Sequence, residues 1–155
     1  MAWAKAGSTT LGSAGDSISL LALSGTFLQI ILHTIDSGNA SPKLKINSDT
    51  GSNYSTRISD NGAADATHTL AYLAVDVGDD NDCFCINYLI NIATEEKLQI
   101  GFAVDQAAVG ATPPGRREIV GKWANTSNAI TSAEVYNINT GNFDTDSNCT
   151  ILGTD

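Results

Sequence analysis

Short segments of alternating apolar and polar residues recur along the chain and predict β-strands. Ile18 and Leu20 alternate with serines, and residues 26–35 form a longer run of apolar and β-branched residues. Residues 70–75 are apolar on both faces, which predicts a central strand. Further strands are predicted around Leu44 and Ile46 and at residues 54–58, 83–92, 98–104, 117–124, 130–138 and 149–152.

Turn residues separate these segments. Residues 36–39 read Asp-Ser-Gly-Asn, residues 60–62 read Asp-Asn-Gly, and residues 113–115 read Pro-Pro-Gly, a sequence that cannot continue a hydrogen-bonded ladder. Strands that recur about every 8–12 residues are typical of an antiparallel sandwich or barrel. No amphipathic stretch of helical length lies between them, which excludes βαβ units. The sequence therefore predicts an all-β antiparallel β-sandwich, with a jelly roll of about eight strands as the leading form.

The chain of 155 residues fits one domain, residues 16–155, preceded by a segment of small residues at 1–15. We expect this first segment to form a short N-terminal arm or an edge strand, because it has too little apolar content to build a core element. Trp3 is its exception. An aromatic side chain on such an arm packs into a groove, either on its own domain or on a neighbour.

Charge excludes one class of partner. Seventeen acidic residues against eight basic ones give a net charge of −9, so a polyanion such as nucleic acid would be repelled. No apolar stretch reaches the length of a membrane span, and residues 1–5 lack the apolar core of a secretory leader. We therefore expect a protein that folds in the cytoplasm, with neither nucleic acid nor membrane among its partners.

The chain carries three cysteines, an odd number. Cys83 and Cys85 are two residues apart in an apolar run, which places them on the same face of a strand and too close for an ordinary disulfide. His33 and His68 do not stand at zinc-motif spacing from them. We expect these two thiols and that of Cys149 to be reduced, buried and structural.

Nothing in the sequence commits the chain to catalysis. The two histidines lie inside predicted strands, and no G-x-S-x-G nucleophile elbow is present. The glutamates and aspartates do not form a recognisable pair of the kind that glycosidases use. The prediction is a protein that is not an enzyme and has no cofactor, and for which sugar binding is more plausible than sugar cleavage.

Two oxygen-rich loops are candidates for a bound cation. Asn47, Asp49 and Asn53 provide oxygen atoms at alternate positions, like the start of an EF-hand loop, but Ile58 stands where a bidentate glutamate is needed. The alternative is that such side chains satisfy the backbone of turns, and on balance no metal site is predicted. The second loop contains Asp79, Asp80 and Asp82.

Residues 116–125 concentrate much of the basic charge and one of the two tryptophans. Arginine and tryptophan are enriched at interface hot spots, and positive residues in an acidic chain suit an acidic partner, including another copy of the protein. The alternative is a core tryptophan beside a solvated strand end. The candidate interface residues are Trp3, Arg116, Arg117, Lys122 and Trp123.

Several segments resemble a group of structural proteins of tailed phages and environmental viruses. They are residues 47–54 (NSDTGSNY), 91–98 (NIATEEKL), 116–126 (RREIVGKWANT), 139–143 (NTGNF) and 151–153 (ILG). The resemblance runs from about Asp16 to the end of the chain and includes no catalytic signature.

This resemblance implies a virion component, made in the host cytoplasm, of the small jelly-roll type. Such domains serve as capsid decoration (cement) proteins or as parts of fibres. We favour decoration because the chain has no long repetitive stalk. The resemblance further implies contacts with the major capsid protein and with copies of itself in a homotrimer. The alternative is a carbohydrate- or receptor-binding domain of a tail or fibre, which would need exposed aromatic residues on a concave sheet.

Overall fold

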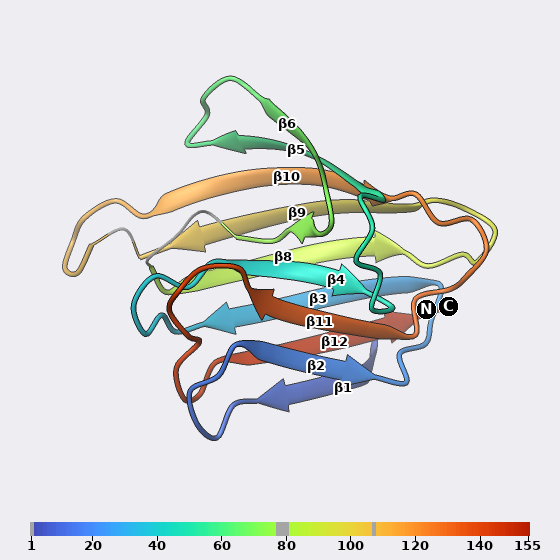
Figure 1. Ribbon diagram of the computed structural model, residues 1–155, viewed down its shortest axis with the longest axis horizontal. Coiled ribbons are helices and arrows are strands. Elements are labelled where there is room, and N and C mark those ends of the chain that lie inside the picture. Colours follow the sequence, from blue (N-terminus) through green and yellow to red (C-terminus); the bar gives the residue numbers. More distant parts are fainter. Residues whose placement is uncertain (1, 77–80, 107) are drawn as a thin grey trace.

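The protein is built from antiparallel strands throughout the part that the computed structural model describes, residues 2–76, 81–106 and 108–155 (Figure 1). The predicted all-β class is confirmed. No helix of these residues has the length and hydrophobicity needed to cross a membrane. The twelve strands in the described residues are β1 (Ala4–Thr10), β2 (Ser17–Leu21), β3 (Phe27–Thr34), β4 (Pro42–Ile46), β5 (Tyr54–Asp60), β6 (Ala66–Leu70), β7 (Leu73–Ala74), β8 (Cys83–Ile90), β9 (Lys97–Asp105), β10 (Gly115–Trp123), β11 (Ser132–Asn137) and β12 (Asn148–Thr154).

The strands form two sheets, as the prediction of a β-sandwich requires. The larger sheet has the order β1-β12-β3-β8-β9-β10-β5-β6, and the smaller one has the order β2-β11-β4-β7. Four strands of the larger sheet, in the order β1-β12-β3-β8, correspond one by one to the strands β2-β11-β4-β7 of the smaller sheet. The two strands of each corresponding pair have consecutive numbers. The chain crosses between the sheets at each step from β1 to β5, from β6 to β8 and from β10 to β12. Without the two hairpins β5–β6 and β9–β10, this is the connectivity of a jelly roll.

Four further strands are added to the predicted jelly roll of about eight strands. The β5–β6 hairpin and the β9–β10 hairpin are additions to the eight-stranded arrangement, and together they extend the larger sheet beyond β8. In Figure 1 the strands β10, β5 and β6 lie past the smaller sheet. The sequences of β5, β9 and β10 alternate like those of the other strands, so periodicity alone could not separate them from the sandwich.

Two boundary predictions have definite outcomes. The first segment of the chain is an edge strand, because β1 pairs with β12 along Ala4–Thr10. The prediction of one central strand over residues 70–75 was wrong. Leu70 ends β6 in the larger sheet, and only Leu73 and Ala74 form β7, a short edge strand of the smaller sheet. Leu73, Ala74 and Val75 are buried, whereas residues 70–72 at the passage from one sheet to the other are half-buried.

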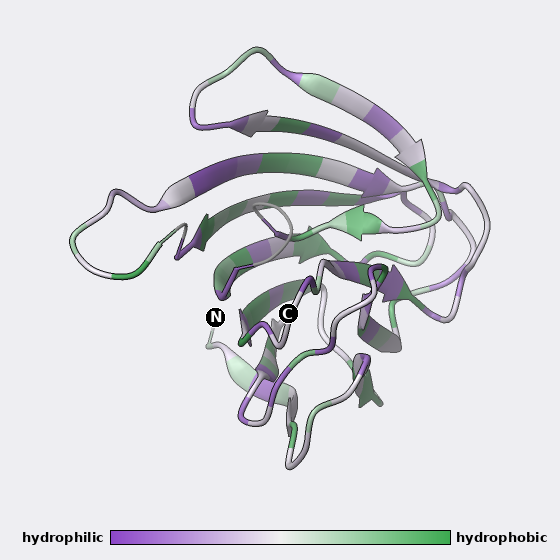
Figure 2. Ribbon diagram, turned by 60° about the vertical axis from the view of Figure 1, so that its left-hand side comes forward, coloured by the Kyte–Doolittle hydropathy of each residue, from purple (hydrophilic) through white to green (hydrophobic). Residues whose placement is uncertain are grey.

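The core lies between the two sheets and follows the alternation of each strand. Bands of hydrophobic and hydrophilic residues succeed one another along the strands of the larger sheet (Figure 2). Tyr54 and Trp123 are fully buried and stack with ring centroids 6.2 Å apart. The three cysteines are buried and form no disulfide, as predicted. Burial raises the pKa of Cys85 well above its ordinary value and that of Cys149 to about 12, so these thiols are poor nucleophiles.

The interior also holds a charged network beside β7. The carboxylate of Asp76 is fully buried and accepts hydrogen bonds from Lys43 Nζ at 2.7 Å and Ser41 Oγ at 3.1 Å. Arg117 reaches the same carboxylate at 3.4 Å and also pairs with Asp60 at the sheet margin. Burial raises the pKa of Asp76, while the neighbouring Lys43 and Arg117 lower it. The network ties β4 and β10 to the crossover that follows β7.

Candidate interaction surface

The face of the larger sheet that points away from the smaller sheet carries most of the exposed large apolar side chains among the described residues. These side chains come from the centre of the sheet, from β3, β8, β9 and β10, with one contribution from the segment before β1. We call this surface the outer apolar face. Its members are Trp3, Phe27, Phe84, Tyr88, Leu98, Ile100, Phe102, Val104 and Val120.

Strand β9 departs most from the usual pattern of a sandwich strand. Its outward positions are all apolar, and Phe102 among them is 62% exposed. Its inward positions are Lys97, Gln99, Gly101 and Ala103, all buried. A shift of one residue would reverse the two faces, but the ladders to β8 and β10 fix the register. The strand therefore keeps its apolar side in solvent and its polar side in the interior.

The polar interior of β9 is hydrogen-bonded. The Gln99 amide donates to Asn87 Oδ1 at 2.7 Å and to the Ala74 carbonyl at 2.9 Å. Gly101 leaves the space that Asn87 occupies, because a Cβ at that position would lie 1.9 Å from Asn87 Oδ1. Specific partners on β7 and β8 therefore hold β9 with its polar side inward and its apolar side outward. Its outward face is a consequence of this interior and cannot turn inward without breaking these bonds.

Two hollows lie on the outer face. The first, of about 490 Å³, is apolar and lies between Trp3 and the strands β3, β8 and β9. Trp3 packs edge-on against Tyr88 with ring centroids 6.3 Å apart, and the Tyr88 hydroxyl accepts a hydrogen bond from Gln29 at 3.0 Å. Trp3 remains 44% exposed. It therefore lies in a groove of its own domain and still offers surface to a partner.

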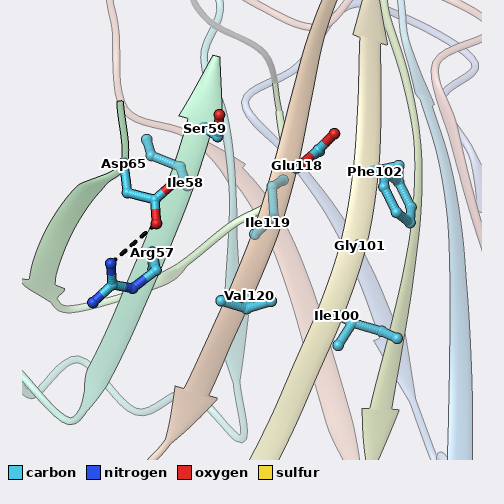
Figure 3. Close-up of a pocket in the computed structure, with 10 residues that line it drawn as sticks. All are labelled: Arg57, Ile58, Ser59, Asp65, Ile100, Gly101, Phe102, Glu118, Ile119 and Val120. Atoms are coloured by element: carbon cyan, nitrogen blue, oxygen red, sulfur yellow. Dashed lines mark hydrogen bonds and ion pairs between the residues drawn. The ribbon is translucent and has the colours of Figure 1, made fainter. Parts of the chain in front are cut away.

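The second hollow, of about 410 Å³, mixes apolar and charged groups (Figure 3). Phe102 and Val120 point into it from β9 and β10. Arg57 and Asp65 form an ion pair of 3.0 Å on the opposite side of the hollow from Phe102. Glu118 lies between them, on β10. The residues that line it come from β5, from Asp65 just before β6, and from β9 and β10, so the hollow belongs to the two added hairpins.

The predicted interface residues of β10 are divided by its alternation. Arg116 and Lys122 point outward, where Arg116 lies 3.7 Å from Glu118 and Lys122 pairs with Glu96 at 2.7 Å. Trp123 is 1% exposed and Arg117 belongs to the Asp76 network, so neither reaches a partner directly.

Trp123 is a core tryptophan, which is the alternative given in the sequence analysis, and it is not a surface residue that a partner could contact. The physical reason is parity, because Trp123 and Arg117 share the inward side of β10 with the buried Ile119. That spacing was present in the sequence and is the signal that would have separated the two pairs of residues.

The oxygen atoms of the first candidate cation loop are engaged by protein donors. The Asp49 carboxylate accepts hydrogen bonds from the Trp123 indole at 2.7 Å, from the Asn53 amide and from the Gly51 backbone. Burial raises the pKa of Asp49, but these hydrogen bonds outweigh it and the pKa is lowered. Asn47 Oδ1 likewise accepts from the backbone of Ser132 at 3.0 Å. These residues organise the loop around Trp123 in the way that the turn alternative describes.

Of the second candidate loop, Asp79 and Asp80 lie outside the described residues. The remaining member, Asp82, accepts a hydrogen bond from the backbone of Asp36 at 2.8 Å. Within residues 2–76, 81–106 and 108–155, no three His, Cys, Asp or Glu side chains are placed to hold a metal ion.

The two histidines are not neighbours. His33 is on β3 and His68 on β6, which are separated by five strand spacings in the larger sheet, or roughly 24 Å. They therefore do not form one site. The chain matches no protein-family model and no curated protein.

Proposed function

We propose that the protein is a structural component of a virus particle, a capsid decoration protein that acts through protein–protein contacts and not through catalysis. Two observations support this proposal. The sequence segments described above resemble virion structural proteins. The sandwich also exposes an apolar surface of a kind that stable protein interfaces bury.

Strand β9 is the observation on which the proposal mainly rests. An isolated domain gains stability by placing Leu98, Ile100 and Phe102 inside, and this chain places them outside while Lys97 and Gln99 are inside. Such an arrangement is advantageous where another protein covers the outer face. We propose that this cover is provided in the assembled particle, by the major capsid protein, by copies of the same chain or by both.

The proposed mechanism is passive. A protein that binds the assembled shell and not its separated subunits stabilises the shell by mass action. A small sandwich that contacts several subunits buries surface across their boundaries, which raises the barrier to shell opening. The protein would be made in the host cytoplasm and reach the outside as part of the particle.

Quantitative mass spectrometry of purified particles tests this proposal. We expect the protein in numbers comparable to those of the shell subunits. Particles that lack it should open at lower temperature than particles that carry it, and adding the purified protein back should restore the difference. Its absence from intact particles, or its presence in only a few copies, would contradict a decoration role.

The variant Trp3→Ala is expected to weaken attachment to the particle and leave the fold intact. Trp3 precedes β1, is partly exposed and covers Tyr88, so its loss removes contact surface without opening the core. Buried tryptophans at interfaces contribute about 2 kcal/mol or more, which corresponds to roughly 30-fold weaker binding. Occupancy on purified particles and thermal unfolding of the free protein are the two measurements. Unchanged occupancy would exclude Trp3 from the attachment surface.

The hollow of Figure 3 favours a second candidate function, carbohydrate or receptor binding. Sugars require an apolar platform with hydrogen-bonding groups beside it, and Phe102 lies there beside Glu118, with the Arg57–Asp65 pair across the hollow. A glycan array with the wild type and the variant Glu118→Ala would test it. Binding that is lost in the variant would support this function, and an array without binding would reject it.

A further inference from the structure

We infer that two copies of the chain pair face to face through the outer apolar face, related by a two-fold axis. This goes beyond the proposed function, because it names the protein that covers this surface and holds whether or not the chain belongs to a virion. The inference depends on the size, the charge and the uniqueness of the face.

The size of the outer apolar face suits one side of a stable interface. Its nine members are between 37% and 62% exposed. With the usual areas of aromatic and aliphatic side chains, this amounts to roughly 700 Å² of apolar surface. A standard interface buries about 800 Å² per partner, and the largest apolar patch of a typical monomer is about 300–600 Å². The pairing of two such faces would therefore reach the standard size without other contacts.

The charges around the face do not oppose a partner with the same net charge. Three ion pairs border it, Arg116–Glu118, Arg57–Asp65 and Lys122–Glu96. Each pair is internally neutral, so the rest of the chain carries the whole net charge of −9. Two copies repel each other through this net charge, and the ion pairs around the outer face add nothing to that repulsion.

The described residues offer no second apolar surface to which the outer face could bind. The other exposed large apolar residues are scattered over the smaller sheet and the loops. A patch with no counterpart elsewhere on the molecule meets itself, which gives a contact with two-fold symmetry, whereas a ring of three needs two different surfaces. These scattered residues are Leu21, Ile92, Val109 and Ile138.

The apolar character of the face also indicates a permanent partner. Interfaces that form and dissociate are about as polar as the rest of the surface, while homodimer interfaces are more apolar and resemble a domain core cut in half. The outward side of β9 has no polar residue from Leu98 to Val104. A second copy is present from synthesis onward and can cover such a surface permanently.

Analytical ultracentrifugation of the full chain tests the pairing. We expect a mass twice the 16.2 kDa of one chain at micromolar concentration. The variants Phe102→Asp and Ile100→Asp should each raise the dissociation constant at least about 100-fold, because each buries an unpaired carboxylate in the interface. Leu21→Asp is the matched control. This variant places the same charge at a residue of the smaller sheet that is 72% exposed. Its measured mass should remain that of two chains.

A second readout does not depend on any variant. Trp3 belongs to the outer apolar face, whereas Trp123 is buried, so quenching of tryptophan fluorescence by acrylamide reports Trp3. Quenching of the wild type should increase on dilution as pairs separate. A monomer at all concentrations, a trimer, or a pair that Leu21→Asp separates and Phe102→Asp does not, would each overturn the inference.

The same proteins distinguish this inference from the proposed function. If the wild type is a monomer in solution but abundant on particles, the pairing fails and the virion role stands. If it is a pair in solution but absent from particles, the virion role fails and the pairing stands.

Discussion

Replacing Asp76 by alanine is expected to lower the free energy of unfolding by about 3–5 kcal/mol. The carboxylate is fully buried and is the shared partner of Lys43 at 2.7 Å and Arg117 at 3.4 Å. Its removal leaves the buried ammonium of Lys43 without a counter-charge, and such an uncompensated charge costs far more than the lost hydrogen bonds. Urea or guanidinium unfolding of the variant and the wild type measures the difference.

A double-mutant cycle shows whether the cost comes from the orphaned charge. Lys43→Met removes the cation, so the double variant Asp76→Ala, Lys43→Met should be more stable than the sum of the two single effects predicts, by about 2 kcal/mol. Additive effects would mean that Asp76 acts only by filling space. The control is the exposed pair of Arg57 and Asp65, where Asp65→Ala should cost less than about 1 kcal/mol.

The fold class could be predicted from the sequence because alternation and turn residues are local signals. The segments that became β3, β8 and β12 have apolar residues at every second position and end at Gly, Asn or Asp. The placement of the β5–β6 and β9–β10 hairpins outside the sandwich could not be predicted, because β5, β9 and β10 have the same local pattern as the strands of the sandwich. Whether a hairpin belongs to the two-layer core depends on what lies across from it, and that is not a local property.

The candidate surface was predictable only in part. Trp3 could be proposed as an interface residue because an aromatic stands alone among small residues. The outward side of β9 could not, since local alternation by itself places Leu98, Ile100 and Phe102 in the core. Their exposure follows from the register with β8 and from the hydrogen bonds of Gln99, which involve residues far away in the sequence.

The second large expected effect concerns Lys97, the buried lysine of β9. Lys97 is fully buried at the start of β9, and its ammonium donates to three backbone carbonyls, those of Ala93 at 3.0 Å, Glu95 at 2.7 Å and Asn125 at 2.7 Å. It also lies 5.6 Å from the centre of the Trp123 ring. Burial lowers the pKa of Lys97, but three acceptors match the three N–H bonds of the charged form.

The variant Lys97→Met is therefore expected to lower the free energy of unfolding by about 3–5 kcal/mol, with a fall in Tm of roughly 10–15 °C. Methionine keeps the length of the side chain and leaves the three carbonyls without their donor, so the loops at residues 91–96 and 124–131 lose their common anchor. Differential scanning calorimetry measures the shift in Tm.

Lys122→Met is the matched control for this variant. Lys122 is on the neighbouring strand, points outward and pairs with Glu96 at the surface, so its replacement should change the free energy of unfolding by less than about 1 kcal/mol. If Lys97→Met is as stable as this control, the ammonium does not hold the two loops together. The buried ammonium of Lys97 would then not be what keeps the apolar side of β9 in solvent.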